Sequence, residues 1–127
     1  MQKSENEDEL TRRVIGCAME VHRALGPGLL ESADEECLCR ELELQEISFE
    51  RQVLLPVNYK GISLACGYRM DLVIQGELVV ELKAVDALLP IHEAQLLTYL
   101  RLSGIRRGLL LNFHVSLLRD GIRRRIL

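Results

Sequence analysis

The spacing of apolar residues predicts two helices in the first third of the chain. Apolar positions recur every three or four residues over 7–25, as expected for a helix with one buried face, and Gly26-Pro27-Gly28 follows as a stop signal. A second helix is predicted from about Leu30 to Glu46, where acidic residues in the first turns suit the positive end of the helix dipole. The first nine residues, MQKSENEDE, are expected to form a flexible acidic segment.

After Ser48 the pattern changes to alternating and β-branched residues, which are typical of strands. Three antiparallel strands are predicted over residues 49–59, 62–74 and 78–85, because Lys60-Gly61 and Gln75-Gly76-Glu77 lie between them as turn sequences. They would form a meander.

Pro90 then opens a third predicted helix over residues 91–103, which Gly104 closes. A short apolar run at 108–113 is typical of a buried strand, and residues 122–127 would form an edge strand. The order α-α-β-β-β-α-β predicts an α/β (α+β) fold with a mixed central sheet flanked by helices.

Length and composition favour one packed domain over residues 1–127. The chain is 48% hydrophobic and 28% charged, which is enough to build a core at this size. No run approaches the roughly 18 apolar residues of a membrane span, and the acidic start is unlike a signal peptide, so we expect a cytoplasmic protein with no membrane partner. The four cysteines are interpreted as reduced core thiols, since Cys37-x-Cys39 lacks the second pair typical of a zinc site.

Charge is distributed unevenly although the net charge is only −3. Residues 1–50 hold 5 basic and 13 acidic side chains, whereas residues 51–127 hold 11 basic and 6 acidic ones. The second part could present a positive surface to nucleic acid, or simply a solvated basic strand near its end. Two Phe, three Tyr and no Trp argue against an aromatic platform for single strands. The candidate nucleic-acid-binding residues are Arg69, Arg101, Arg106 and Arg107.

One pair of predicted strands carries a candidate catalytic cluster. If Ile74 and Leu78 close a three-residue loop, Asp71 lies across from Glu81, and Lys83 projects from the same face as Glu81. Opposed carboxylates call for a cation, either the lysine or a divalent metal such as Mg²⁺. A lysine beside a metal can activate water or stabilise charge on a phosphate, which predicts phosphodiester hydrolysis. The alternative is a solvated strand face with a cross-strand ion pair.

Two further features could contribute to this cluster. Gln95 and Tyr99 are four residues apart on the third helix, so they share one face and could contact a phosphate or position the lysine. Glu31, near the start of the second helix, could supply a third carboxylate, although compensation of the helix dipole also explains an acid there.

Four segments between Val14 and Leu118 carry a resemblance to a known family. They are GLLESAD (28–34), GYRMDLVI (67–74), VVELKAV (79–85) and HEAQLLTYL (92–100). They resemble the GxxExxY proteins, small prokaryotic proteins of the PD-(D/E)XK nuclease-like superfamily. The resemblance implies a restriction-endonuclease-like core and an Mg²⁺- or Mn²⁺-dependent nuclease acting on nucleic acid.

The resemblance also implies residue roles. It makes Asp71 the motif aspartate, Glu81 and Lys83 the (D/E)XK pair, and Glu31 the helix glutamate, while Gln95 and Tyr99 match the QxxxY element of RecB-type nucleases. Asp71, Glu81 and Glu31 would then be the metal ligands. The implied catalytic residues are Asp71, Glu81, Lys83, Gln95 and Tyr99.

The chain departs from the family at Asp34, where the family motif has tyrosine. If the tyrosine packs under the site, the entrance of the helix is altered here; if it contacts substrate, affinity falls. The alternative function is therefore a catalytically silent nucleic-acid-binding or protein-interaction module that retains the fold. A homodimer with paired sites would cut both strands of a duplex more readily than a monomer.

Overall fold

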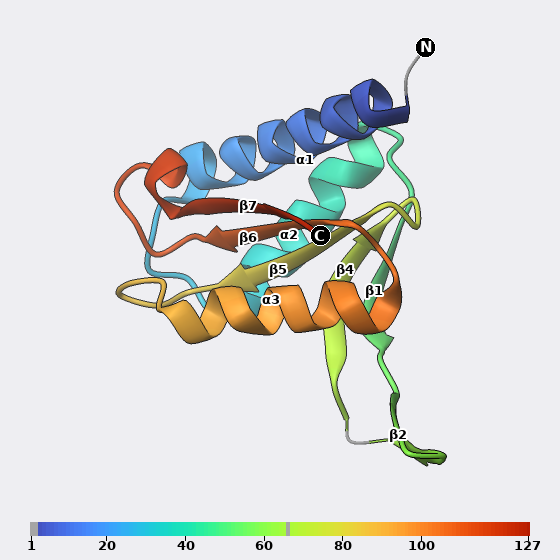
Figure 1. Ribbon diagram of the computed structural model, residues 1–127. Helices are drawn as coiled ribbons and strands as arrows, with labels where there is room; N and C mark the ends of the chain where they lie inside the picture. The colour runs from blue at the N-terminus through green and yellow to red at the C-terminus, as the bar shows by residue number, and fades with distance from the viewer. Residues whose placement is uncertain (1–2, 66) are drawn as a thin grey trace.

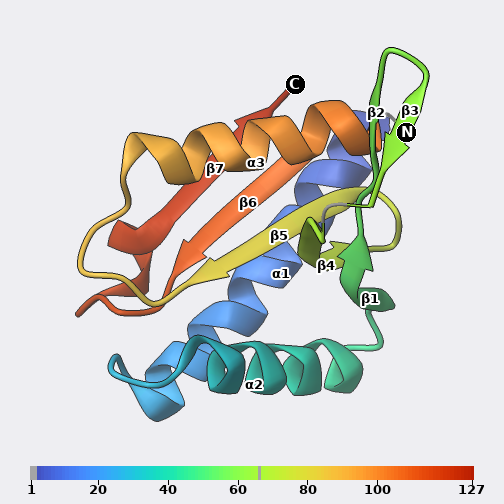
Figure 2. The same cartoon turned by 90° about the horizontal axis from the view of Figure 1, so that it is seen from below.

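A five-stranded sheet lies between two layers of helices in the computed structural model, which describes residues 3–65 and 67–127. Helices α1 (Lys3–Leu25) and α2 (Glu31–Leu44) cover one face, and helix α3 (Pro90–Ser103) covers the other (Figure 1, Figure 2). The strands of the sheet are β1 (Phe49–Leu54), β4 (Arg69–Ile74), β5 (Leu78–Lys83), β6 (Arg107–Asn112) and β7 (Ile122–Ile126). This arrangement confirms the predicted α+β fold with a mixed sheet.

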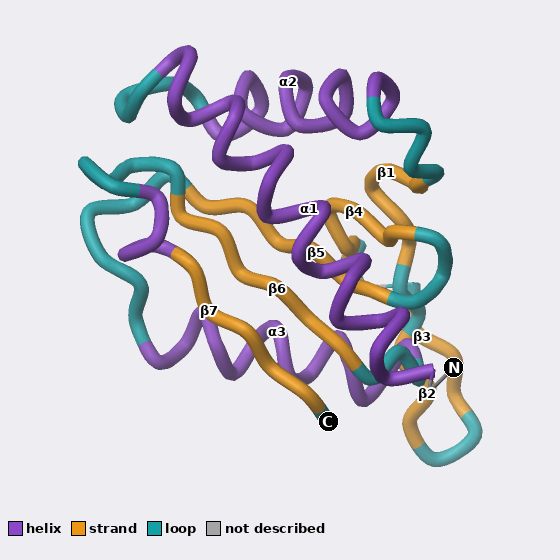
Figure 3. Tube along the Cα trace, turned by 90° about the horizontal axis from the view of Figure 1, so that it is seen from above, coloured by secondary structure: helices purple, strands orange, loops and turns teal. Residues whose placement is uncertain are grey.

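The strand order is β1-β4-β5-β6-β7. Strands β5 and β6 are parallel, because α3 connects them as a crossover on one face, and the other neighbouring pairs are antiparallel (Figure 3). A short 3₁₀ helix, η1 (Leu118–Gly121), precedes β7. None of the helices in the described ranges is long and apolar enough to cross a membrane.

The alternation along β5 assigns its side chains to two separate cores. Leu78, Val80 and Leu82 pack with α1 and α2, whereas Val79 packs on the opposite face with Leu96 of α3. The remaining two residues of the strand continue the second set, so their side chains lie on the α3 face of the sheet. These two residues are Glu81 and Lys83.

The two long strands predicted over 49–59 and 62–74 are each divided. Pro56 has no N–H to donate and follows β1, and the chain then forms a separate two-stranded ladder of β2 (Val57–Tyr59) and β3 (Ile62–Leu64). This β2–β3 arm projects from the body of the molecule (Figure 1). The predicted turn at its tip is confirmed, with Lys60 and Gly61 both left-handed at φ 46° and 87°.

The helix boundaries differ from the predicted ones by a few residues. Helix α1 begins at Lys3, four residues before the predicted start, and α2 ends at Leu44 rather than Glu46. Gly104 ends α3 as predicted, with a left-handed φ of 77°. The flexibility expected for residues 1–9 stays a prediction; residues 1–2 and Cys66 lie outside the described residues.

Candidate active site

The site begins where the ladder between β4 and β5 ends. Leu72 lies opposite Val80, which is the register predicted from the length of the hairpin loop. At the next position, backbone N–H groups bond to side-chain carboxylates in place of backbone carbonyls. The Asp71 N–H donates to Glu81 Oε2 at 2.8 Å, and the Leu82 N–H donates to Asp71 Oδ2 at 2.9 Å. The two carboxylates therefore lie side by side where the strands separate.

Glu81 is only 5% exposed. Burial raises the pKa of its carboxyl to about 8, and the Asp71 carboxylate adds to the rise. The hydrogen bond from the Asp71 N–H and the nearby Lys83 ammonium oppose this effect. The interpretation as a solvated strand face is therefore wrong, since the glutamate is buried beside a second acid.

Helix α3 brings two polar side chains to Lys83. Its Nζ donates to Gln95 Oε1 at 3.4 Å, and Gln95 Nε2 donates to the Tyr99 hydroxyl oxygen at 3.0 Å. Tyr99 is 5% exposed, and burial followed by the Glu81 carboxylate raises the pKa of its hydroxyl. Within the described residues Lys83 forms no ion pair with either carboxylate, so the ammonium is oriented by an amide.

Glu31 approaches Asp71 and Lys83 from the other helical layer, formed by α1 and α2. It is the first residue of α2. Partial burial raises the pKa of its carboxyl, Lys83 lowers it, and Asp71 raises it again; a hydrogen bond from the Ala84 N–H also lowers it. Because Lys83 and Asp71 both act on its carboxyl group, Glu31 lies near these two members of the predicted cluster.

The donor chemistry of this cluster suits a hard divalent cation. Asp71, Glu81 and Glu31 offer carboxylate oxygens, the ligands that Mg²⁺ and Mn²⁺ prefer. Burial first and the Asp71 carboxylate second raise the pKa of Glu81, and a cation bound beside the two acids would favour their charged forms. The three acids do not form a closed cage, because no group of three His, Cys, Asp or Glu side chains in residues 3–65 and 67–127 has metal-binding geometry.

A family model described as the PD-(D/E)XK nuclease superfamily matches residues 8–125. The chain belongs to this nuclease superfamily. No curated protein and no solved structure matches the chain. The narrower assignment to the GxxExxY proteins is compatible with the superfamily and stays a prediction.

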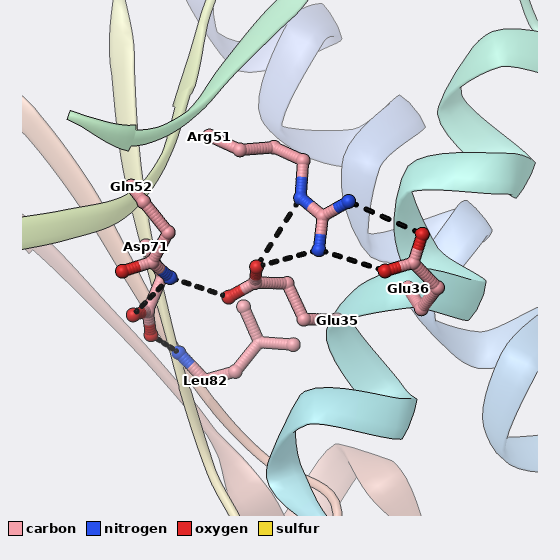
Figure 4. Close-up of polar contacts among 6 residues, drawn as sticks. All are labelled: Glu35, Glu36, Arg51, Gln52, Asp71 and Leu82. Carbon is pink, nitrogen blue, oxygen red and sulfur yellow. Dashed lines mark hydrogen bonds and ion pairs between the residues drawn. The ribbon is translucent and has the colours of Figure 1, made fainter.

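This nuclease-superfamily chain holds Asp71 through a network of side chains that was not predicted from the sequence (Figure 4). Gln52 Nε2 donates to Asp71 Oδ1 at 3.3 Å and to Glu35 Oε1 at 3.0 Å. Arg51 Nη2 donates to Glu35 Oε2 and Glu36 Oε2, each at 3.0 Å. The network thus connects α2 to β4 through β1. No local sequence pattern indicates it, because residues that bond to one another in it are up to 19 positions apart in the sequence.

The four arginines predicted to bind nucleic acid lie on different elements of this superfamily member. Arg107 pairs with Leu78 at the start of β5, five residues and about 16 Å of strand from Lys83, and it forms an ion pair with Asp8. Arg106 precedes it at the same end of the sheet. Arg69 and Arg101 are exposed on β4 and α3. Arg106 and Arg107 therefore lie at the other end of the sheet from Lys83, and the role of the four arginines in binding nucleic acid stays a prediction.

Asp34, the position at which the resemblance to the GxxExxY proteins implies a tyrosine, is 2% exposed. Its Oδ1 has no hydrogen-bond partner among the described residues, and burial raises the pKa of its carboxyl, an effect that His22 opposes. His22 Nε2 lies 2.7 Å from the Val115 carbonyl oxygen. This position therefore faces the interior of this nuclease-superfamily domain, not a substrate.

Proposed function

We propose that this chain is a divalent-metal-dependent nuclease that hydrolyses phosphodiester bonds in DNA or RNA. One observation carries the proposal: Asp71 and Glu81 lie side by side where β4 and β5 separate, Lys83 is near enough to lower the pKa of Glu81, and Gln95 accepts a hydrogen bond from this lysine. Membership of a nuclease superfamily supports the reaction type. Nucleic acid is the partner that this membership favours.

The acids would hold the metal. Asp71 and Glu81 would be ligands and Glu31 a supporting ligand, because Asp71 is near enough to raise the pKa of both glutamates and Glu31 is near enough to raise that of Glu81. When bound, Mg²⁺ or Mn²⁺ would supply positive charge where negative charge develops on the phosphate. The remaining chemistry belongs to side chains of the chain itself.

Lys83 would act on water and phosphate. Its ammonium can orient the attacking water and stabilise the charge that develops on the phosphate oxygens. Gln95 accepts a hydrogen bond from Nζ, and Tyr99 in turn accepts one from Gln95, so this pair fixes the direction of the lysine. Preorganised donors of this kind stabilise a transition state without reorganising during the reaction.

A silent nucleic-acid-binding or protein-interaction module is the second candidate function. The observation that favours it is that both site carboxylates already accept backbone hydrogen bonds, so each has a structural role without metal. Such a module would bind nucleic acid or protein without turnover.

Two measurements separate these candidates. Calorimetric titration with Mn²⁺ should show binding by the wild-type protein and its loss in Asp71→Ala. Plasmid DNA, single-stranded DNA and RNA should each be tested for cleavage by the wild type, by Lys83→Ala, and by Lys60→Ala, which removes the same charge at the tip of the β2–β3 arm.

We expect Lys83→Ala to lose at least about 100-fold in cleavage rate while keeping Mn²⁺ binding, and Lys60→Ala to match the wild type. Equal cleavage by Lys83→Ala would refute the role of the lysine. Mn²⁺ binding with no cleavage of any substrate would favour the silent module. Nicked rather than linear plasmid products would indicate that single sites act alone, whereas direct linearisation would support a homodimer.

A further inference from the structure

Gln52 has a left-handed backbone in the middle of a strand. Its φ is 50°, a region that residues other than glycine rarely adopt because the Cβ atom crowds the backbone. The ladder with β4 continues past this residue in an unbroken register, since Val53 pairs with Met70. Gln52 therefore lies directly across from Asp71.

This backbone directs two consecutive side chains to the same helix. Neighbouring residues of a regular strand point to opposite faces of the sheet. Arg51 and Gln52 nevertheless both bind Glu35 of α2, the arginine through Oε2 at 3.0 Å and the glutamine through Oε1 at 3.0 Å (Figure 4). The left-handed φ of Gln52 accounts for this departure from alternation.

We propose that Gln52 is a positioning residue for Asp71. Its Nε2 donates to Asp71 Oδ1 at 3.3 Å, while the Leu82 N–H donates to Asp71 Oδ2 at 2.9 Å. Both carboxylate oxygens are therefore held, which fixes the plane of the carboxylate. Glu35 accepts the other hydrogen bond from the same amide group and is itself held by Arg51, so the amide cannot turn without losing a partner.

The backbone conformation of Gln52 supports a role in positioning Asp71 over a role confined to the fold of β1. Glycine is the residue that a left-handed position favours, and a strained non-glycine residue persists where its side chain is needed. The chain also provides a matched control in Gln75, a second left-handed glutamine with φ 52° in the turn between β4 and β5. There the turn itself calls for the conformation, and the side chain lies at the far end of β4 from Asp71.

The first test needs no metal. In the full chain, hydrogen exchange of the Leu82 amide is compared between wild type, Gln52→Ala and Gln75→Ala by NMR, with the Val80 amide of the same strand as internal reference. We expect Leu82 to exchange at least ten-fold faster in Gln52→Ala, relative to Val80, because its acceptor is no longer held. Gln75→Ala should leave the ratio unchanged. An unchanged ratio in Gln52→Ala overturns the proposal.

The second test measures what the positioning does for the proposed metal site, and it rests on the proposed function. Mn²⁺ affinity should fall about ten-fold or more in Gln52→Ala, the usual range when a residue that orients a ligand is removed. Gln52→Gly removes the strain together with the side chain and should lose as much. Gln52→Glu keeps the shape but replaces the donor with an acceptor, and should lose at least as much. Gln75→Ala should bind as the wild type does.

The two proposals fail separately. If the wild type binds Mn²⁺ and cleaves nucleic acid while Gln52→Ala does so equally well, the positioning role is wrong and the nuclease function stands. If the wild type neither binds Mn²⁺ nor cleaves nucleic acid, the nuclease function is wrong. Faster exchange of the Leu82 amide in Gln52→Ala would still show that Gln52 positions the Asp71 carboxylate.

Discussion

Replacing Glu81 with glutamine should remove a large pH dependence from the stability of the metal-free protein. Burial and Asp71 raise the pKa of Glu81 from 4.5 to about 8, so the folded state favours the neutral acid. The stability from this preference is complete below pH 4.5 and is lost as the pH rises through about 8. At about 1.4 kcal/mol per pKa unit, the loss between pH 5 and pH 8 is about 3 kcal/mol.

The assay is urea denaturation followed by circular dichroism at pH 5 to 9 in the presence of a chelator. Between pH 5 and pH 8 the wild-type free energy of unfolding should fall relative to that of Glu81→Gln by about 3 kcal/mol. Glu77→Gln, which removes a carboxylate from the turn of the same hairpin, is the control and should follow the wild type. Parallel curves for the wild type and Glu81→Gln would refute the reasoning, because they would mean that Glu81 is ionised in the folded state over the whole range.

Two further substitutions test packing in the interior of the domain. Asp34→Asn should raise the free energy of unfolding by about 1–2 kcal/mol at pH 7, because it removes a buried charge with an unpartnered oxygen. This gain should vanish near pH 3, because burial raises the pKa of Asp34 and the carboxyl is neutral there. Urea titrations at both pH values measure it, and an unchanged gain at pH 3 would contradict it. Gly108→Ala should lower stability by about 1–3 kcal/mol, since the new Cβ would lie 2.8 Å from Leu96 Cδ1 beneath α3. A thermal melt that equals the wild type would show that Leu96 repacks freely.

The central pair of acids could be predicted from the sequence because a hairpin loop fixes its own register. Three residues between Ile74 and Leu78 are enough to set Asp71 against Glu81, and the structure has this register. Gln95 and Tyr99 could be predicted for a similar reason, since four residues make one turn of a helix. Each of these relations is local, or depends on one short connection.

The contacts that were missed depend on how distant elements pack. Glu35 and Gln52 are 17 residues apart and meet only because α2 lies against the strand that contains Gln52. The left-handed backbone of Gln52 has no signature in an alternating strand. The sequence also does not show where Arg106 and Arg107 lie relative to Lys83, because the parallel pairing of β5 and β6 decides that they are at the other end of the sheet.

The hydrogen bonds at the end of the β4–β5 ladder bear on how the site would change during evolution. Asp71 and Glu81 each accept a backbone N–H of the other's strand, so a chain that lost catalysis would still lose stability if either acid were replaced. Lys83 has no comparable structural role, because its hydrogen bond among the described residues is to one side-chain amide. Selection for stability alone would therefore preserve the acidic pair and release the lysine. Among related chains, the lysine is the better marker of members that still turn substrate over.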